Sequence, residues 1–379
     1  MKKNMYLKSV IMLSMFCFLS LSVAEARIKL VALPKRADTI IRLDNPQFTL
    51  IEEERVLTLQ QGLNKVDFSW NGVSIDPDSI RIDILSHSDQ VTLLNVSYPP
   101  NENALVWEIS SAGAREEKIR VSYLLSNIDR LITYKSVADK AETQVNFKSH
   151  LILRNFSGED FANAKVLLDY GESFEEGIRH EETKQLLFLK AGTVPIEKVW
   201  QWDSKKQIWD PEEVDQNVGI PVHYRITNTT DSNLGQNALW NGKMRVFQLD
   251  GHGSTILLGE DAVDLTPVGE DMEVYIGDSR DLVVTQRKMV DKQTNIRRNT
   301  SGRVVLYDNE EQVTAKIENF KDTNAKLKMV QHIPGEWDMH SCNFEYKKEN
   351  ANTIEFEIDV PAQGKAELVM HYFRRNIRN

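Results

Sequence analysis

The segment NALVWEISSAGAREEKIRVSY, from Asn103 to Tyr123, shows most plainly how this chain folds. In its second half, Ile119, Val121 and Tyr123 alternate with polar residues. Alternate side chains of a β-strand lie on one face, so this pattern is typical of a strand with one face on a core and the other in water. A turn of small residues that includes Gly113 separates it from an apolar first half. The segment therefore predicts two strands joined by a short turn.

The same pattern recurs along the chain. Ile80–Ile84 alternates apolar with charged residues, and Asp250-Gly251 predicts a hairpin that joins Met244–Leu249 to Thr255–Leu258. Residues Asn352–Tyr372, NTIEFEIDVPAQGKAELVMHY, repeat the layout of the first segment and also end in Tyr. Two interpretations of this repeat stay open: equivalent hairpins that close two sandwich domains, or the chance likeness of ordinary hairpins.

Many short strands separated by turns predict an all-β chain. We expect two or more immunoglobulin-like or fibronectin-like β-sandwich domains after a cleaved signal peptide. The expected divisions are a signal peptide over residues 1–26, an N-terminal β-sandwich domain over 27–126, a middle β-rich region over 127–280 and a C-terminal immunoglobulin-like sandwich over 281–379.

The amino terminus has the pattern of an export signal. Three lysines lie among the first eight residues, an apolar run follows from Val10 to Val23, and Ala24-Glu25-Ala26 supplies small residues for cleavage before Arg27. The apolar run is short for a membrane span, although an uncleaved anchor is the alternative. Large residues before Cys17 disfavour a lipid anchor. The expected location is periplasmic or secreted, with no stable membrane insertion after cleavage.

Composition limits the classes of partner. The 379 residues include 46 Lys and Arg against 56 Asp and Glu, a net charge of −10. Such a charge disfavours nucleic acid or an anionic membrane surface as the main partner. Two cysteines are too few for a disulfide scaffold or a cysteine-built zinc module, and only Cys342 remains after signal cleavage.

Three ordered blocks resemble the mucoidy-inhibitor-like family. They are LILRNFSGEDFANAKVLLDYG at Leu151–Gly171, the segment Gly242–Val284, and the segment His332–Tyr372. Their order and spacing are similar to that family's C-terminal domain of unknown function. The coiled-coil insertion of the fuller family members has no counterpart here. The resemblance implies a β-rich fold and a place in the cell envelope linked to exopolysaccharide, and it supplies no catalytic residues.

Residues that carry chemistry form no catalytic motif. The sequence has no phosphate-binding Gly-rich loop, no nucleophile elbow and no HExxH pair. Glu52–Glu54 and Glu260-Asp261 are candidate carboxylate pairs for glycoside hydrolysis, or simply solvated charges. His340 and Cys342 are expected on one strand face, where they are two potential metal ligands or a packed strand thiol beside a histidine. We therefore expect no catalytic, cofactor-binding or metal site, and no cofactor.

Aromatic residues supply the sharpest candidate for binding. Trp200, Trp202 and Trp209 are predicted to share a hairpin, where three exposed indoles would form a platform for a glycan or another partner. The alternative is that they fill a core. A basic stretch, comprising Arg287, Lys288, Lys292, Arg297 and Arg298, offers contact with an anionic polymer, or is a solvated strand.

These observations favour a non-enzymatic exported protein that acts as an interaction or assembly factor of the cell envelope. Its expected partner is an envelope protein or a polysaccharide. Strand addition to an exposed sheet edge is one mode of binding. The alternative is a carbohydrate-active protein, which binds glycans through the Trp cluster or hydrolyses them through a carboxylate pair.

Overall fold

The computed structural model describes residues 29–45, 47–168, 173–210 and 219–378. The predicted signal peptide at residues 1–26 lies outside them, so its cleavage stays a prediction. Strands make up five sheets, and the described residues include no α-helix. Two short 3-10 turns are η1 (Pro77–Ser79) and η4 (Thr230–Ser232). The predicted all-β class is confirmed.

The chain divides into two units by its internal contacts. The first unit consists of residues up to Asp129 together with Arg154–Thr183, and the second consists of Arg130–Leu153 together with the chain from Lys184 onward. The first family-like block therefore contributes most of its residues to the first unit. The second and third blocks lie in the second unit.

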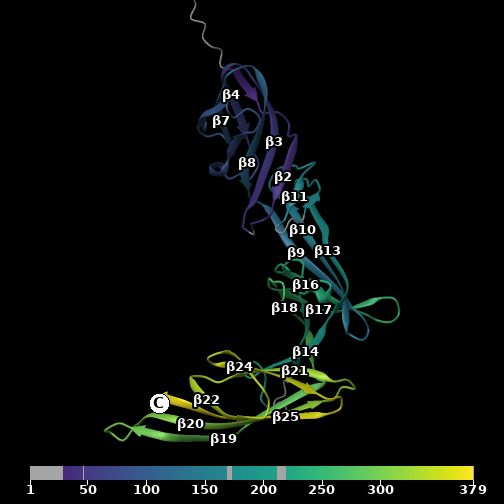
Figure 1. The fold of residues 1–379 in the computed structure, drawn as a ribbon, viewed down its shortest axis with the longest axis vertical. Helices are drawn as coiled ribbons and strands as arrows, with labels where there is room; N and C mark the ends of the chain where they lie inside the picture. Colours follow the sequence, from purple (N-terminus) through teal and green to yellow (C-terminus); the bar gives the residue numbers. More distant parts are fainter. Residues whose placement is uncertain (1–28, 46, 169–172, 211–218, 379) are drawn as a thin grey trace, which may run out of the picture. The chain divides into compact units, whose positions relative to one another are not determined.

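The first unit contains two sheets (Figure 1). One has the strand order β1-β4-β7-β6, with β1 (Lys29–Ala32), β4 (Gly62–Ser69), β7 (Ala104–Ser111) and β6 (Val91–Ser97). The other has the order β12-β11-β2-β3-β8-β5, with β12 (Ser173–Glu175), β11 (Lys165–Leu167), β2 (Asp38–Arg42), β3 (Thr49–Leu59), β8 (Arg115–Leu125) and β5 (Arg81–Ile84).

The second unit contains the other three sheets. Sheet β13-β10-β9-β16-β17 consists of β13 (Thr183–Pro195), β10 (Gln144–Asn155), β9 (Ile128–Ala138), β16 (Gly242–Leu249) and β17 (Thr255–Val263). Sheet β18-β15-β14-β21-β24-β23 consists of β18 (Asp271–Ser279), β15 (Ile220–Thr227), β14 (Glu197–Asp203), β21 (Ala325–His332), β24 (Thr353–Val360) and β23 (Lys347–Asn350). Sheet β19-β20-β25-β22 consists of β19 (Leu282–Arg298), β20 (Val304–Asn319), β25 (Lys365–Arg378) and β22 (Glu336–Cys342).

The same eight-stranded arrangement occurs once in each unit. Orders β1-β4-β7-β6 and β2-β3-β8-β5 in the first unit correspond to β14-β21-β24-β23 and β19-β20-β25-β22 in the second. The corresponding strands follow one another in the same chain order, with β15 to β18 inserted after the first strand of the second copy. In each copy the first strand pairs parallel with the fourth, and the other pairs within these orders are antiparallel. The chain therefore carries two copies of one sandwich-like topology.

The sequence repeat coincides with this duplication. Asn103–Tyr123 contains β7 and most of β8, and Asn352–Tyr372 contains β24 and most of β25. The six apolar positions that alternate in each segment are all buried; they are Leu105, Trp107, Ile109, Ile119, Val121 and Tyr123, and Ile354, Phe356, Ile358, Leu368, Met370 and Tyr372. The two strands of each segment belong to different sheets, however, so neither segment is a hairpin. Each segment links the two facing sheets of its copy.

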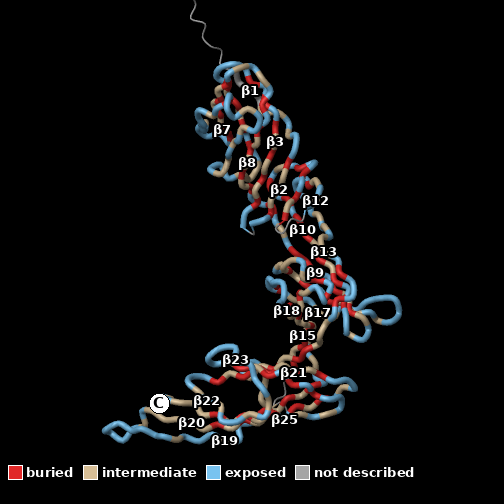
Figure 2. The backbone as a smooth tube through the Cα atoms, viewed as in Figure 1, coloured by how far each residue is buried: buried red, intermediate tan, exposed pale blue. Residues whose placement is uncertain are grey.

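Alternating burial explains why these segments form strands that face one another (Figure 2). In β3 the pattern is BiBiBiBeBeB, where B is buried, i is intermediate and e is exposed. In the first unit the ring centroid of Phe68 on β4 lies 5.8 Å from that of Trp70 and 5.5 Å from that of Trp107 on β7. It also lies 6.0 Å from the ring centroid of Tyr123 on β8, which belongs to the other sheet. In the second unit one buried cluster takes side chains from β14, β21 and β24 and also from β19, β20 and β25.

The predicted hairpin at Asp250-Gly251 is confirmed, since β16 pairs antiparallel with β17. The Asp250 carboxylate accepts hydrogen bonds from the backbone N–H groups of His252 and Ser254, at 2.7 and 2.9 Å. Gly251 and Gly253 both have positive φ, which glycine adopts without steric cost. The turn is thus a five-residue loop held by the aspartate side chain.

Candidate functional site

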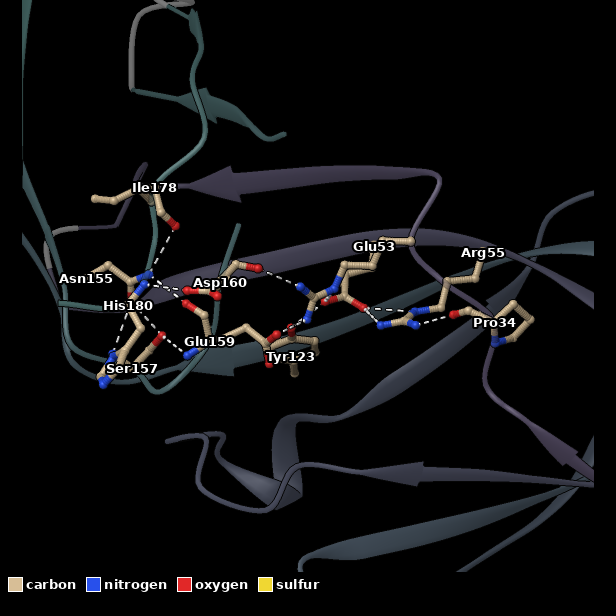
Figure 3. Close-up of polar contacts among 11 residues, drawn as sticks. Pro34, Glu53, Arg55, Tyr123, Asn155, Ser157, Glu159, Asp160, Ile178 and His180 are labelled. Carbon is tan, nitrogen blue, oxygen red and sulfur yellow. Dashed lines mark hydrogen bonds and ion pairs between the residues drawn. The ribbon is translucent and has the colours of Figure 1, made fainter. Parts of the chain in front are cut away.

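A cluster of charged side chains lies between the two sheets of the first unit, beside a cavity (Figure 3). Its centre is Glu53 on β3, whose side chain is 0% exposed. Arg55 comes from the same strand, Tyr123 from β8, and Arg36 from the connection between β1 and β2. The loop after β10 adds Glu159. Segments far apart in the sequence therefore contribute to one site.

Glu53 accepts contacts from three groups. Its Oε1 lies 2.6 Å from Arg36 Nε, and the Tyr123 hydroxyl donates a hydrogen bond to the same oxygen at 2.6 Å. Its Oε2 accepts from Arg55 Nη2 at 2.5 Å and from Arg55 Nε at 3.0 Å. A buried carboxylate needs this degree of pairing, because desolvation of an isolated charge is costly.

The two arginines also hold the backbone around them. Arg55 Nη1 donates to the carbonyl oxygen of Pro34. Arg36 Nη1 donates to the carbonyl oxygen of Asp160 at 3.0 Å, and its Nη2 pairs with Glu159 at 2.8 Å. The Arg36 guanidinium also lies over the ring of Phe161. The cluster thereby connects three segments: the connection between β1 and β2, the strand β3, and the loop after β10.

The loop after β10 owes its shape to the Asn-Phe-Ser-Gly-Glu-Asp sequence of the first family-like block. Asn155 Nδ2 donates to the carbonyl oxygens of Glu159 and Ile178, at 2.7 and 3.3 Å, and its Oδ1 accepts from the Ser157 backbone at 3.1 Å. His180 Nδ1 accepts from the Gly158 N–H at 3.1 Å. These bonds fix the loop so that the Glu159 carboxylate lies at Arg36.

Gly158 is required in that loop for two reasons. Its φ is +87°, in the region that favours glycine, and a Cβ atom added there would lie 2.0 Å from the carbonyl oxygen of Gly72. A hydrogen bond also joins the loop that contains Gly158 to the loop that contains Gly72, because the Ser74 N–H donates to the Ser157 carbonyl oxygen at 2.8 Å. Any larger residue at position 158 must displace the loop that delivers Glu159.

The electrostatics hold two members of the cluster, Tyr123 and Arg36, in their ordinary charge states. Burial, together with the neighbouring Glu53 carboxylate, raises the pKa of the Tyr123 phenol, so Tyr123 stays a hydrogen-bond donor. Burial alone would lower the pKa of the Arg36 guanidinium, but Glu53 and Glu159 outweigh it and the net pKa is raised. At neutral pH, Tyr123 is therefore a neutral hydrogen-bond donor and Arg36 a fixed positive charge.

A cavity of about 460 Å³ adjoins these charges. Its lining comprises Leu33, Lys35, Arg36, Arg55, Phe68, Ser69, Trp70, Ile75, Tyr123 and Glu159. The lining thus includes three cationic side chains and two aromatic residues, Phe68 and Trp70, which are only 5% and 6% exposed. The volume lies within the range of roughly 300–1,000 Å³ that is usual for small-molecule sites.

The second copy of the fold carries a related cluster around Glu311 on β20, whose side chain is 3% exposed. The Tyr372 hydroxyl donates to Glu311 at 3.0 Å, Lys288 pairs with it at 3.0 Å, and Arg374 pairs with it at 3.3 Å. Glu311 lies directly opposite Tyr372, whereas Glu53 lies two residues beyond Ile51, the residue opposite Tyr123. The two clusters are thus similar in chemistry, but the position of the glutamate relative to the tyrosine differs by two residues along the strand.

The tryptophans predicted as a binding platform lie elsewhere. Trp200 and Trp202 share one face of β14, as expected, and are only 3% and 1% exposed. Trp209 is partly buried against the same core and donates from Nε1 to the Ser204 carbonyl oxygen at 2.8 Å. Because buried indoles cannot stack on a sugar ring, this placement corrects the expectation of an exposed platform. Trp200 and Trp202 instead fill a core, as the alternative interpretation expected.

His340 and Cys342 do not share a strand face, which corrects the expected pair of metal ligands. A register shift between Met339 and Ser341 turns them apart. The His340 ring packs on His371, at 4.9 Å between ring centroids, whereas Cys342 packs against the buried core of the second unit. Burial raises the pKa of the Cys342 thiol, which disfavours the thiolate that binds metals. Over the described ranges, no three His, Cys, Asp or Glu side chains are grouped to hold a metal ion.

The other predicted residues have ordinary ionic partners. Glu52 pairs with Arg42 at 2.9 Å, and Glu260 pairs with Lys243 and Arg245 at 2.7 Å each. In the basic stretch, Arg287 pairs with Asp210 at 2.7 Å and Lys288 belongs to the Glu311 cluster. The remaining members, Lys292, Arg297 and Arg298, lie on β19 and are exposed.

Comparison with known proteins adds no identification. No model of a known protein family matches the chain. The search of curated proteins gives no match either. In the part of the chain that the structure describes, no helix has the length and apolar character needed to cross a membrane.

Proposed function

We propose that this chain is a non-enzymatic exported protein of the bacterial cell envelope that binds another envelope protein as an interaction or assembly factor. The export pattern at the amino terminus and the resemblance of three ordered blocks to the mucoidy-inhibitor-like family support the location. The fold supports the role, because a scaffold made of two copies of one sandwich-like arrangement offers sheet edges at which a partner chain can add a strand.

The observation that carries this proposal is the apolar tip of the β16–β17 hairpin, within the second family-like block. Leu249, Ile256 and Leu257 are 47%, 51% and 58% exposed. Adjacent residues of a strand point to opposite faces, so exposure of both Ile256 and Leu257 means that neither face of the tip is covered. Within the described chain, β17 is the last strand of its sheet, and its Thr255–Leu258 half pairs only with β16.

An open edge flanked by exposed apolar side chains suits an extended polypeptide. Main-chain hydrogen bonds along the edge would supply affinity, and the apolar side chains would supply contact area. A monomeric protein that leaves such an edge bare risks self-association, which a resident partner prevents. We therefore infer that the partner presents an extended apolar segment to β17.

The sandwich-like copies are also proposed to be immunoglobulin-like or fibronectin-like in architecture. Two mainly antiparallel sheets that face one another across an apolar core support this. Their strand order differs from the immunoglobulin order, in which the first, second, fifth and fourth strands share one sheet. The proposed likeness is therefore one of architecture and not of strand connectivity.

Cross-linking in living host cells tests the proposal. The full-length tagged chain and its double variant Ile256→Ser, Leu257→Ser are cross-linked, and captured proteins are identified. The proposal expects one envelope protein that recurs with the parent chain and is reduced at least tenfold with the variant. Equal capture by both chains, or capture of polysaccharide with no protein, contradicts it. N-terminal sequencing of the exported chain, expected to begin at Arg27, tests the location separately.

A further inference from the structure

The cavity of the first unit is lined by three cationic side chains, those of Lys35, Arg36 and Arg55. The aromatic residues of its lining, Phe68 and Trp70, are only 5% and 6% exposed, so they offer a ligand little surface. The ion pairs described above hold Arg36 and Arg55 in place, so the cationic part of the lining is already formed without a ligand.

The charges around the cavity do not cancel. Three cationic side chains, Lys35, Arg36 and Arg55, face two carboxylates, Glu53 and Glu159, which leaves one positive charge in excess (3 − 2 = 1). Of the two carboxylates, only Glu159 lines the cavity, because Glu53 lies behind the arginines.

The related cluster of the second unit provides an internal comparison. There Lys288 and Arg374 face Glu311 and Asp291, so two cations meet two carboxylates and the charges balance. The excess positive charge is therefore a feature of the cluster in the first unit and not of the Glu311 cluster. Positive charge at a partly dry surface attracts an anion, since electrostatic attraction strengthens where water is excluded.

Arg36 and Arg55 retain N–H donors with which they can bind an anion. A guanidinium has five N–H donors. Arg36 uses three nitrogens, one contact each, on Glu53, Glu159 and the Asp160 carbonyl oxygen, and Arg55 likewise uses three on Glu53 and the Pro34 carbonyl oxygen. Each therefore keeps two N–H groups, one on each terminal nitrogen. Lys35 is exposed, also lines the cavity and adds an ammonium group.

We propose that this cavity binds a small organic anion, with its carboxylate held by Lys35, Arg36 and Arg55. The site is separate from the β17 edge and does not depend on the proposed partner. The same chemistry is offered by a free carboxylic acid and by the carboxyl end of a polypeptide, and the experiment distinguishes these sources.

The test is calorimetric titration of the full mature chain with benzoate and with benzamide, its neutral counterpart of the same shape. The proposal expects saturable binding of benzoate and at least tenfold weaker binding of benzamide, because charge-assisted hydrogen bonds are about twice as strong as neutral ones. Lys35→Gln is expected to weaken benzoate binding about tenfold. The matched control is Lys65→Gln on the outer part of β4, which should bind like the parent chain.

No saturable binding of benzoate, equal binding of benzamide, or unchanged benzoate binding by Lys35→Gln overturns the proposal. Because Lys35 is exposed, this variant is expected to keep the circular dichroism of the parent chain.

Peptides ending in phenylalanine, with a free or an amidated carboxyl group, identify the source of the anion. Tighter binding of the free-carboxyl peptide than of benzoate assigns the cavity to a polypeptide end. Tighter binding of benzoate assigns it to a free acid. Both results support an anion site, and equal binding of the free and amidated peptides counts against one.

Discussion

Glu53→Gln is the substitution that best measures how much the buried cluster contributes to stability, apart from the rest of the chain. The change keeps the size of the side chain but removes the charge that Arg36, Arg55 and Tyr123 share. One carboxylate oxygen becomes an NH₂ group, which faces an arginine donor instead of accepting from it. Two cations are then left without their buried counter-charge, and breaking a buried pair in this way costs about 3–5 kcal/mol.

Hydrogen exchange followed by mass spectrometry measures this cost locally, which matters because a chain of two units does not unfold in one step. At 1.4 kcal/mol for each factor of ten, the amides of β3 and β8 should lose protection by roughly a hundredfold to several thousandfold. Amides of the second unit should keep theirs. The control Glu52→Gln removes a partly exposed pair with Arg42 and should cost about 0–1 kcal/mol. A loss below about tenfold for Glu53→Gln, or an equal loss in both units, would refute the reasoning.

Three further predictions follow from single residues. Gly158→Ala should destabilise the first unit by about 1–3 kcal/mol, measured by hydrogen exchange, since its Cβ meets backbone and its φ is positive. In the same measurement Gly192→Ala, where the added Cβ meets nothing within 4 Å, should change the stability of the second unit by about 0.5 kcal/mol or less. Trp202→Ala should cost the second unit about 3–5 kcal/mol by hydrogen exchange, and a loss below 1 kcal/mol would contradict its core position. Hydrogen bonds from Asn309 and Lys288 outweigh burial and lower the pKa of Glu311 below its ordinary 4.5. The stabilising contribution of the Glu311 carboxylate is therefore full above pH 4.5 and is lost as pH falls through the lower folded-state pKa. Glu311→Gln should flatten the loss of stability that the parent chain shows in acid. An unchanged dependence of stability on acid pH would contradict this assignment.

Period-two alternation carried most of the fold prediction. It was enough for the all-β class and for strands such as β24, because side chains at Ile354, Phe356 and Ile358 all face one core. It was not enough for the pairing of strands. The segments ending in Tyr123 and Tyr372 look like hairpins in sequence, yet each sends its two strands to different sheets. A short turn can join strands of one sheet or of two facing sheets, and local residues do not decide which.

The sequence analysis treated Glu52–Glu54 as a candidate carboxylate pair or as solvated charges, but Glu53 is buried, and the sequence carried a signal of this. In Thr49–Leu59 the inward positions of the alternation include Glu53 and Arg55 among apolar residues. Charged residues at core positions are rarely fully buried unless they are paired. The partners Arg36 and Glu159 come from distant segments, so only the tertiary structure shows that they meet. The same holds for His340, which a bulge at Met339 and Ser341 turns away from Cys342.

The most direct test of the proposed role is photo-cross-linking in living cells from a single position. A photoreactive amino acid replaces Leu257 at the tip of β17, and the control places it at Leu94 in the first unit, which is equally exposed at 58%. The account predicts one discrete adduct with an exported envelope protein from position 257, and none of that species from position 94. The same adducts from both positions, or no protein adduct from position 257, would contradict the claim that this chain holds an envelope partner at the β17 edge.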